Sequence, residues 1–385
     1  MISASQTSVR GQATRAKGRD ALTIGRSAEI AQRLKPVSLR PLPEDPLVSV
    51  LTGNYNYASF LGEAIQSVLV QTYTNFEVIV CDDGSTDKSC EVVEQYAQRD
   101  PRVRLIRQQN GGQASAWNTA YRECKGEIIC FLDADDRYLP EKLQLVVGAF
   151  RTEVDSGFAG HRMYRIDVVG RRHGVVPATA DPPSGWYGPF VVRSGTSPPA
   201  MAFGSGLCLR RAISDLIFPI PEGLRICADE AVTTLGPLLT PLVGIPAPLA
   251  EYRYHGKNVW NSPQLSSESR DRIQEIHRKM WEISREYLGK TDPILVEAFP
   301  SFDECQGTLL NAYIRERLQV WGGALSAYRN LMRAEAFLTI RPAWRWFWRF
   351  SILLPPPVFH YALGPGGLRQ LVWKARETRR KLFAS

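Results

Sequence analysis

Two clusters of carboxylates are the residues of this chain best suited to chemistry. The first occupies residues 82–87, of sequence DDGSTD, and the second occupies residues 133–136, of sequence DADD. Each follows an apolar run that is typical of a buried strand. Because Mg²⁺ and Mn²⁺ prefer oxygen ligands and usually share them with substrate phosphates, a short Asp-x-Asp turn suits a metal bound to a diphosphate. The clusters therefore indicate nucleotide-sugar chemistry with Mn²⁺ or Mg²⁺.

The segments that must position these clusters alternate between strand and helix patterns. This alternation favours an α/β fold with right-handed crossovers and a mainly parallel sheet that has helices on both faces. Ligands of such sheets bind at the carboxyl ends of the strands. Asn54 and both acidic clusters come at or after strand ends, so we expect them to share one edge. The expected strands are near residues 47–51, 76–81, 103–107 and 127–132, and the expected helices are near 58–70, 87–98, 113–124 and 141–150.

The rest of the chain is organised differently. Residues 151–226 are rich in Gly, Pro and Arg and predict short strands and loops, which we assign to a half of the domain that faces the acceptor. An apolar helix is expected after Asp229 and Glu230, and apolar residues keep a helix-like spacing within 264–340. The predicted organisation is a disordered basic leader over 1–45, an α/β domain over 46–262 with halves 46–150 and 151–262, a helical region over 263–340, and an aromatic and basic segment over 341–385.

Charge is distributed unevenly along the 385 residues. Residues 1–40 carry eight Lys or Arg against two Asp or Glu, and residues 341–385 carry nine against one, so these ends contribute +6 and +8. The whole chain is +8, which leaves −6 for the residues between the two ends. A nucleic-acid-binding domain usually carries its basic charge on the folded body. We therefore expect no nucleic-acid partner.

Cysteine use and hydropathy narrow the cellular setting. The seven cysteines are scattered without a Cys-x-x-Cys pair, which argues against a disulfide scaffold or a structural zinc site and fits a reducing cytoplasm. No apolar segment typical of a secretory signal follows the first residues. Two uncharged stretches, 231–250 and 350–368, each contain four prolines, which would leave backbone groups unsatisfied in lipid. Neither stretch is expected to span a membrane.

Six short motifs then place the chain beside a known family. They are VSV at 48–50, NYN at 54–56, DDGSTD at 82–87, NGG at 110–112, FLDADD at 131–136 and YRYHG at 252–256. Their order and spacing resemble those of the inverting family 2 glycosyltransferases of GT-A fold, over roughly residues 46–262. The resemblance implies a Rossmann-like catalytic domain that transfers a sugar from a nucleotide sugar, with UDP expected, to a hydroxyl of a saccharide or lipid-linked saccharide. Such chemistry serves surface polysaccharide or glycolipid synthesis.

The resemblance also assigns donor and metal roles. Asp83 would hydrogen-bond the uracil or an equivalent base, because a carboxylate accepts from ring N–H groups. Asp135 would be the first metal ligand, with Asp133 or Asp136 near the ribose or a metal-bound water. The alternatives are a turn and helix cap at 82–87 and a structural His255. Donor-binding roles are expected for Asn54, Asp82, Asp83, Gly112, Asp133 and Arg253, and metal contacts for Asp135, Asp133, Asp136 and His255.

An inverting transfer needs a base that deprotonates the acceptor hydroxyl. The family usually carries an acidic pair at the start of a helix about a hundred residues beyond the Asp-x-Asp, and here Asp229 and Glu230 stand 94 and 95 residues after Asp135. Alignment by position selects Glu230 as the base, whereas a shift of one residue selects Asp229. The alternative is an acidic first turn that merely favours the helix dipole.

The C-terminal segment combines aromatic and basic residues. Residues 344–350, of sequence WRWFWRF, and the later basic run at 379–381 suit the headgroup region of a bilayer. We expect this segment to hold the protein peripherally on the inner face of the cell membrane, and packing on the catalytic domain or on a partner subunit is the alternative. Two other functions stay open, a nucleotidyltransferase and a non-catalytic carbohydrate-binding scaffold. The oligomeric state is not predicted.

Overall fold

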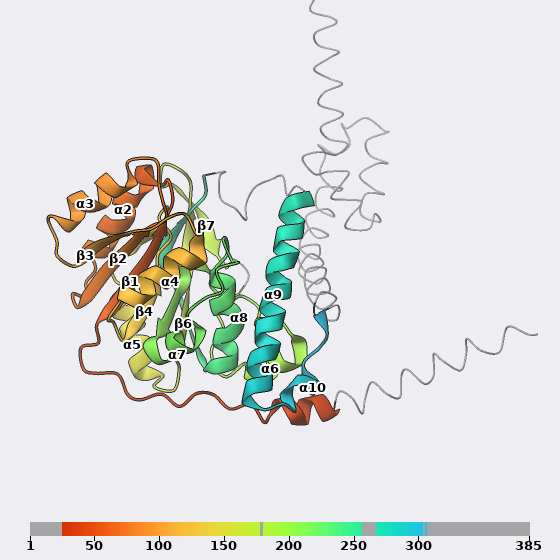
Figure 1. The fold of residues 1–385 in the computed structure, drawn as a ribbon. Helices are drawn as coiled ribbons and strands as arrows, with labels where there is room; N and C mark the ends of the chain where they lie inside the picture. The colour runs from red at the N-terminus through yellow and green to blue at the C-terminus, as the bar shows by residue number, and fades with distance from the viewer. Residues whose placement is uncertain (1–24, 178–179, 256–266, 303–304, 306–385) are drawn as a thin grey trace, which may run out of the picture. The chain divides into compact units, whose positions relative to one another are not determined.

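A nine-stranded sheet forms the centre of the structure, a computed structural model that describes residues 25–177, 180–255, 267–302 and 305 (Figure 1). The strand order is β3-β2-β1-β4-β8-β6-β9-β5, and β7 pairs with β6. The strands are β1 Val48–Asn54, β2 Phe76–Asp82, β3 Val103–Arg107, β4 Ile128–Phe131, β5 Arg137–Tyr138, β6 Phe158–Ile166, β7 Arg172–Val176, β8 Leu207–Arg210 and β9 Leu242–Arg253.

The direction of the strands brings distant segments to one edge. Strands β3, β2, β1 and β4 are mutually parallel, as the strand and helix alternation predicts. Strand β8 is antiparallel to both β4 and β6, and β9 is parallel to β6. The carboxyl ends of β1, β2, β4, β6 and β9 therefore share one edge. The strands of residues 151–253, within the half expected to face the acceptor, continue the same sheet.

Helices cover both faces of the sheet. The helices expected in the first half are found within two residues of their predicted bounds at either end. Residues 151–226, which were expected to hold only short strands and loops, also contain the two short helices α6 and α7. The helices are α2 Ala58–Leu69, α3 Ser89–Ala97, α4 Gln113–Glu123, α5 Lys142–Thr152, α6 Gly188–Ser194, α7 Arg211–Ile217, α8 Asp229–Leu239, α9 Ser267–Thr291 and α10 Leu295–Ala298, with the 3₁₀ turn η1 Gly204–Gly206.

A hydrophobic core lies on each face of the sheet, because side chains alternate between the two faces along each strand. Every residue of β2 is buried, and successive side chains point to opposite faces of the sheet. Val78 and Val80 join the core beneath α2 and α3, whereas Ile79 and Cys81 join the core that holds Trp117 of α4. A strand buried on both faces is a continuous apolar run. This is why the strand at 76–81 is recognisable from the sequence.

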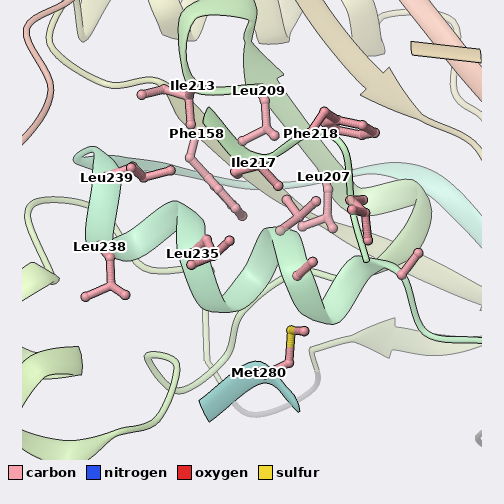
Figure 2. Close-up of a cluster of buried hydrophobic side chains, with 14 of the residues drawn as sticks. Phe158, Leu207, Leu209, Ile213, Ile217, Phe218, Leu235, Leu238, Leu239 and Met280 are labelled. Carbon is pink, nitrogen blue, oxygen red and sulfur yellow. The ribbon is translucent and has the colours of Figure 1, made fainter. Parts of the chain in front are cut away.

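Helix α8 packs deeply into the second of these cores. Figure 2 shows α8 with Leu235, Leu238 and Leu239, beside apolar residues of β6, β8 and α7. Met280 of α9 belongs to the same cluster. Fully burying a leucine side chain contributes about 1.5–3 kcal/mol. The start of α8, which carries Asp229 and Glu230, therefore extends from a firmly anchored helix.

The expected domain boundary near residue 46 is wrong for residues 25–45. Residues 25–31 are helical, and Ile30, Ala31 and Leu34 are buried in the same core as α8. The Val37 N–H donates to the Leu239 carbonyl, and Arg33 pairs with Asp292. Figure 1 shows this segment running from beside α10 to β1. Residues 1–24 of the expected leader lie outside the described part of the chain.

The predicted helical region over 263–340 is described only in part. Helix α9 confirms a helix there, with Ile276, Met280 and Leu288 buried at helical spacing. Pro293 follows the helix, and the short α10 comes next. Within the described ranges, no helix is both long and apolar enough to cross a membrane. Residues 306–340 and the aromatic segment 341–385 fall outside those ranges.

Candidate active site

Asp83 follows the end of β2 and is held by three short hydrogen bonds. Its Oδ1 accepts hydrogen bonds from Gln108 Nε2 at 2.7 Å and from the Gly111 N–H at 2.8 Å, and its Oδ2 accepts from the Gly112 N–H at 2.7 Å. The side chain is buried. A carboxylate has about four acceptor sites, so three bonds leave room for one more. Asp83 can therefore still accept from a nucleobase N–H.

Gly112 serves Asp83 rather than facing a ligand directly. A donor-binding role is expected for Gly112 from the sequence, and in the structure its N–H donates to the Asp83 carboxylate. Gly112 has φ 89°, and a Cβ there would come within 2.6 Å of Arg225 Cα. Only glycine accepts both constraints. The expected direct donor contact is corrected to a supporting one.

Asp82 and Asn54 form a buried pair at the end of β1 and β2. Asp82 Oδ1 accepts from Asn54 Nδ2 at 2.8 Å, and Asp82 Oδ2 accepts from the Ser85 N–H at 3.0 Å. Both side chains are buried. Asp82 therefore fixes the turn after β2, as the turn and cap alternative predicted, and its expected donor-binding role is corrected accordingly. Asn54 Oδ1 is buried and has no hydrogen-bond partner among the described residues.

Asp136 holds the Asp-x-Asp turn in place. Its Oδ2 accepts from Ser205 Oγ at 2.7 Å and its Oδ1 accepts from the Arg253 N–H at 2.8 Å. The carboxyl is fully buried, and burial is the largest cause of a pKa raised well above the usual range. Asp136 stays a predicted ligand, with one hydrogen bond already accepted by each of its oxygens.

Asp135 pairs with the expected histidine. Its Oδ2 lies 2.8 Å from His255 Nε2, and the two side chains are 13% and 4% exposed. The His255 ring stacks on Phe60 at 5.4 Å between centroids and meets Tyr57 edge-on at 5.8 Å. His255 follows β9, and Tyr57 and Phe60 lie at the start of α2, so these contacts hold the ring beside the turn. The structure thus brings together two of the predicted metal-binding residues.

Arg253, for which a donor-binding role is expected, makes three side-chain hydrogen bonds within the protein. Its Nε donates to the Asp135 carbonyl at 2.8 Å, its Nη1 donates to the Val168 carbonyl at 3.0 Å, and its Nη2 donates to Glu63 at 2.7 Å. The side chain is 2% exposed. A planar guanidinium fixed at three nitrogens orients the backbone that it contacts. Arg253 therefore positions the Asp-x-Asp turn.

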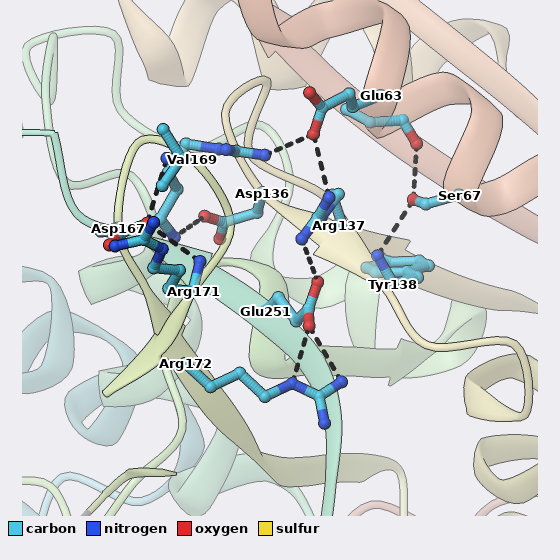
Figure 3. A network of polar contacts seen from close by, with 12 residues as sticks. Glu63, Ser67, Asp136, Arg137, Tyr138, Asp167, Val169, Arg171, Arg172 and Glu251 are labelled. Carbon is cyan, nitrogen blue, oxygen red and sulfur yellow. Dashed lines mark hydrogen bonds and ion pairs between the residues drawn. The ribbon is translucent and has the colours of Figure 1, made fainter. Parts of the chain in front are cut away.

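A chain of ion pairs continues from that contact. Figure 3 shows Glu63 bound to Arg137, Arg137 bound to Glu251, and Glu251 bound to Arg172. The N···O distances are 3.1, 2.7 and 2.9 Å in that order. The chain joins α2, β5, β9 and β7. It ties the turn after β4 to three elements that sequence separation alone would not bring together.

Asp133 and Asp229 meet at Gly204. The Gly204 N–H donates to Asp229 Oδ2 at 3.1 Å, and a Cβ on Gly204 would come within 2.4 Å of Asp133 Oδ2. Burial, then the charges of Asp135 and Asp229, raises the pKa of Asp133 well above its usual range. Burial likewise raises the pKa of Asp229, against a lowering by backbone N–H groups that include Gly204. Asp229 of the acidic pair therefore lies close to Asp133 of the Asp-x-Asp motif.

Glu230 is the carboxylate best tuned for proton transfer near neutral pH. Burial, and to a smaller extent the charge of Asp229, raises the pKa of Glu230 to about 7. A general base works best when its pKa is near the working pH. The two residues differ in partners, since Asp229 faces Asp133 and Gly204 while Glu230 is perturbed by Asp229.

The predicted metal ligands are not gathered into a ready-made cage. Across the described ranges, no three His, Cys, Asp or Glu side chains form a group that could hold a metal ion. Mg²⁺ and Mn²⁺ sites often use one or two carboxylates and complete their shell with substrate phosphates and water. Asp135 with Asp133 fits that type of site. The donor set therefore suits a cation that arrives with a diphosphate.

Three residues at the site were not found from the sequence. Ser205 donates through Oγ to Asp136 and accepts from the Asp133 N–H at 2.9 Å. Lys142 is fully buried, and its Nζ donates to the Ser205 carbonyl at 2.7 Å. Burial, then the charge of Asp135, raises the pKa of Tyr57 to about 12. A lone serine, lysine or tyrosine carries no motif, and only the fold places these three beside the carboxylates.

Comparison with known proteins finds a family match and glycosyltransferase relatives. Residues 49–211 match the model of glycosyl transferase family 2. A glycosyltransferase of Nostoc without an assigned activity is 36% identical over 219 residues, which cover 55% of this chain and 66% of the relative. The chondroitin synthase of Escherichia coli is 41% identical over 109 residues, which cover 28% of this chain and 16% of the synthase. The chain thus spans less than two thirds of either relative.

Among solved structures, Staphylococcus aureus TarS is 21% identical and has a TM-score of 0.46, over 65% of this chain and 70% of that one. The family match agrees with the predicted GT-A type of α/β fold, with its mainly parallel first half and the Asp-x-Asp at the end of β4. Over residues 49–211 the chain is thus similar to glycosyl transferase family 2, and the relatives named above are glycosyltransferases.

Proposed function

We propose that this chain is a metal-dependent inverting glycosyltransferase that moves a sugar from a UDP-sugar to a hydroxyl acceptor. One observation carries the proposal. The base-recognition pocket at Asp83, the Asp-x-Asp turn and the acidic pair at the start of α8 lie at one edge of the sheet, and hydrogen bonds connect them. A nucleotide sugar consists of a base, a diphosphate and a sugar with its reacting carbon, in that order. The three groups of residues could therefore bind these three parts in turn.

Base recognition is assigned to Asp83. Its remaining acceptor site would take the N–H of uracil, and Gln108 and Gly111 hold the carboxylate in place. A cytosine ring presents no N–H donor at the equivalent position, whereas a uracil ring does. This supports UDP as the first choice.

The diphosphate would meet the Asp-x-Asp turn. A bound Mn²⁺ or Mg²⁺, held by Asp135 with Asp133, would neutralise the charge that develops on the departing diphosphate. Arg253 and Asp136 fix the backbone of that turn, and Ser205 fixes the Asp133 N–H. Preorganised groups lower the barrier because they need not rearrange during the reaction.

Glu230 is our first assignment for the general base. The acceptor oxygen attacks the anomeric carbon, its proton passes to Glu230, and the bond between that carbon and the diphosphate oxygen breaks with its electron pair going to the nucleotide. Attack from the opposite side inverts the configuration. Asp229 would act on Glu230 through its negative charge, which raises the pKa of that carboxyl. The alternative exchange of roles between the two is decided by their separate substitution.

Donor turnover tests the proposal. The full chain should release UDP from one or more of a panel of UDP-sugars when Mn²⁺ is present and less after chelation, and Glu230→Gln should abolish most of that release. Release of pyrophosphate from UTP with a sugar phosphate would favour the nucleotidyltransferase instead. Failure to bind or turn over any donor would favour the scaffold and would overturn the proposal.

The acceptor side is proposed more coarsely. We infer a saccharide or lipid-linked saccharide acceptor, and peripheral contact with the inner face of the cell membrane through residues 341–385. That segment lies outside the described residues. A chain ending near residue 340 should lose binding to anionic vesicles and keep donor hydrolysis. Unfolding of the truncated chain would argue for packing on the domain.

A further inference from the structure

We propose that Gln113 is a positioning residue that transmits occupancy of the nucleotide-base pocket to the helix carrying Asp229 and Glu230. This inference rests on the proposed function. Gln113 is the first residue of α4 and follows the glycines that bind Asp83. Its side-chain Oε1 accepts a hydrogen bond from the Ala228 N–H at 2.9 Å, and Ala228 directly precedes α8.

The contact joins two helix starts. The first N–H groups of a helix have no partner within that helix and need one from outside. The Gln113 N–H donates to the Arg225 carbonyl at 2.9 Å, and the Ala114 N–H donates to the Leu224 carbonyl at 3.3 Å. The Gln113 side chain returns the contact by accepting from Ala228. Each helix start is therefore satisfied by the segment beside the other.

The same segment presses against the base pocket. Gly112 is so close to Arg225 that an added Cβ would overlap its backbone, and the Arg225 guanidinium bonds with the Asn110 side chain. Close packing and hydrogen bonds thus join the segment 110–114 to the segment 224–228. A shift of Gly111 or Gly112 when a base binds at Asp83 must be passed on to residues 224–228. Close-packed segments transmit displacement because there is no space to absorb it.

Displacement matters at this point because α8 begins there. Cys227, which precedes Ala228, has φ 59°, a conformation that non-glycine residues seldom adopt. Its carbonyl accepts from the Glu230 N–H at 3.1 Å. The first turn of α8 is therefore set by an unusual backbone conformation and by the Gln113 contact. Loss of that contact leaves a buried N–H without its partner and frees the turn to move.

Gln113→Met tests the idea because it keeps the length of the side chain and removes the acceptor. Asn118→Leu is the matched control, since Asn118 on the same helix exchanges two 2.7 Å hydrogen bonds with Ile220 of the neighbouring segment. In the full chain, Gln113→Met should speed amide exchange at Ala228 and leave Ile220 protected, and Asn118→Leu should do the reverse. Gln113→Glu keeps an acceptor and should restore protection at Ala228.

UDP with Mn²⁺ is the probe of transmission. In the unsubstituted protein its addition should slow exchange at Ala228 further, and this added protection should vanish in Gln113→Met and persist in Asn118→Leu. With an active donor, Gln113→Met should lower kcat by about tenfold, the scale expected for a displaced catalytic group, and leave the donor KM within about twofold. Gln113→Glu should recover most of kcat.

The outcomes separate this inference from the function on which it rests. If UDP binds and protects Ala228 equally in Gln113→Met, Gln113 transmits nothing and the inference is overturned, while the glycosyltransferase proposal stands. If the kcat loss in Asn118→Leu equals that in Gln113→Met, the contact is only structural, which also overturns it. If the unsubstituted protein binds no UDP, the donor assignment and the inference fail together.

Discussion

Replacing Glu230 with glutamine should make the protein more stable at alkaline pH and nearly inactive. Burial, with a contribution from Asp229, raises the pKa of Glu230 from its ordinary value of 4.5 to about 7. Each pKa unit is worth about 1.4 kcal/mol, so the ionised side chain costs the folded state about 3 kcal/mol. An uncharged amide of the same shape avoids that cost. The proposed base is thus a local weakness of the fold.

The dependence on pH follows from proton linkage. A carboxyl whose folded pKa is raised binds more protons in the folded state than in the unfolded state, so stability falls as pH increases. The favourable contribution of Glu230 is fully present below its unfolded pKa of 4.5 and is lost as the pH rises through about 7. The advantage of Glu230→Gln in free energy of unfolding should therefore grow between those values. Above about pH 8 it should stay constant.

Urea unfolding at a series of pH values from about 5 to 8.5, followed by tryptophan fluorescence, measures this advantage. Glu222→Gln is the matched control, because Glu222 is exposed near the same helix. The same preparations should show turnover lowered by about 10² to 10⁴, the usual contribution of a general base. A stability difference that does not change with pH would refute the buried environment of Glu230. Full activity of Glu230→Gln would refute its role as base.

Three further changes test other parts of the site and fold. Asp135→Ala should remove the Mn²⁺ dependence of UDP binding measured by calorimetry, and unchanged Mn²⁺-dependent affinity would exclude Asp135 as a ligand. Asp229→Asn removes the charge that raises the pKa of Glu230, so the acidic limb of the pH profile of kcat should move to lower pH; a loss of turnover at all pH values, with Glu230→Gln active, would make Asp229 the base. Leu34→Ala should lower the free energy of unfolding by about 2–5 kcal/mol because the side chain is 1% exposed, and a change within about 0.5 kcal/mol would show that the N-terminal segment is not part of the core.

The sheet could be predicted from the alternation of strand and helix patterns in the sequence. The structure of the N-terminal segment could not, because its packing partners lie far along the chain. The strand at 76–81 is a largely apolar run between turn residues, and the strand at 103–107 pairs with it in parallel. The segment over residues 25–34 instead buries Ile30 and Leu34 against a core built by α8 and α9. The sequence of residues 25–45 alone does not indicate the core against which these side chains pack. Their basic composition therefore suggested a disordered leader.

The residue types in the sequence identified the carboxylates of the candidate site. The hydrogen-bond partners seen in the structure show which of these carboxylates can still bind a ligand. Asp82 and Asp83 are adjacent and chemically equal, yet Asp82 is consumed by Asn54 and Ser85 while Asp83 keeps an acceptor site. Asp135 and Asp136 differ in the same way. Such differences follow from strand alternation and from loops that arrive from far along the chain. A motif can name four carboxylates but cannot say which of them are already satisfied.

The distribution of charge in the site explains why a cation suits the reaction. The negative charges of Asp135 and Asp229 raise the pKa of Asp133, which expresses their repulsion of its ionised form. The positive charge of Lys142 acts in the opposite direction on Asp133, but Lys142 is fully buried and bonded to the Ser205 carbonyl. A diphosphate would add negative charge to carboxylates that already repel. A divalent cation between the diphosphate and these carboxylates would attract both, so donor and metal should enter the site together.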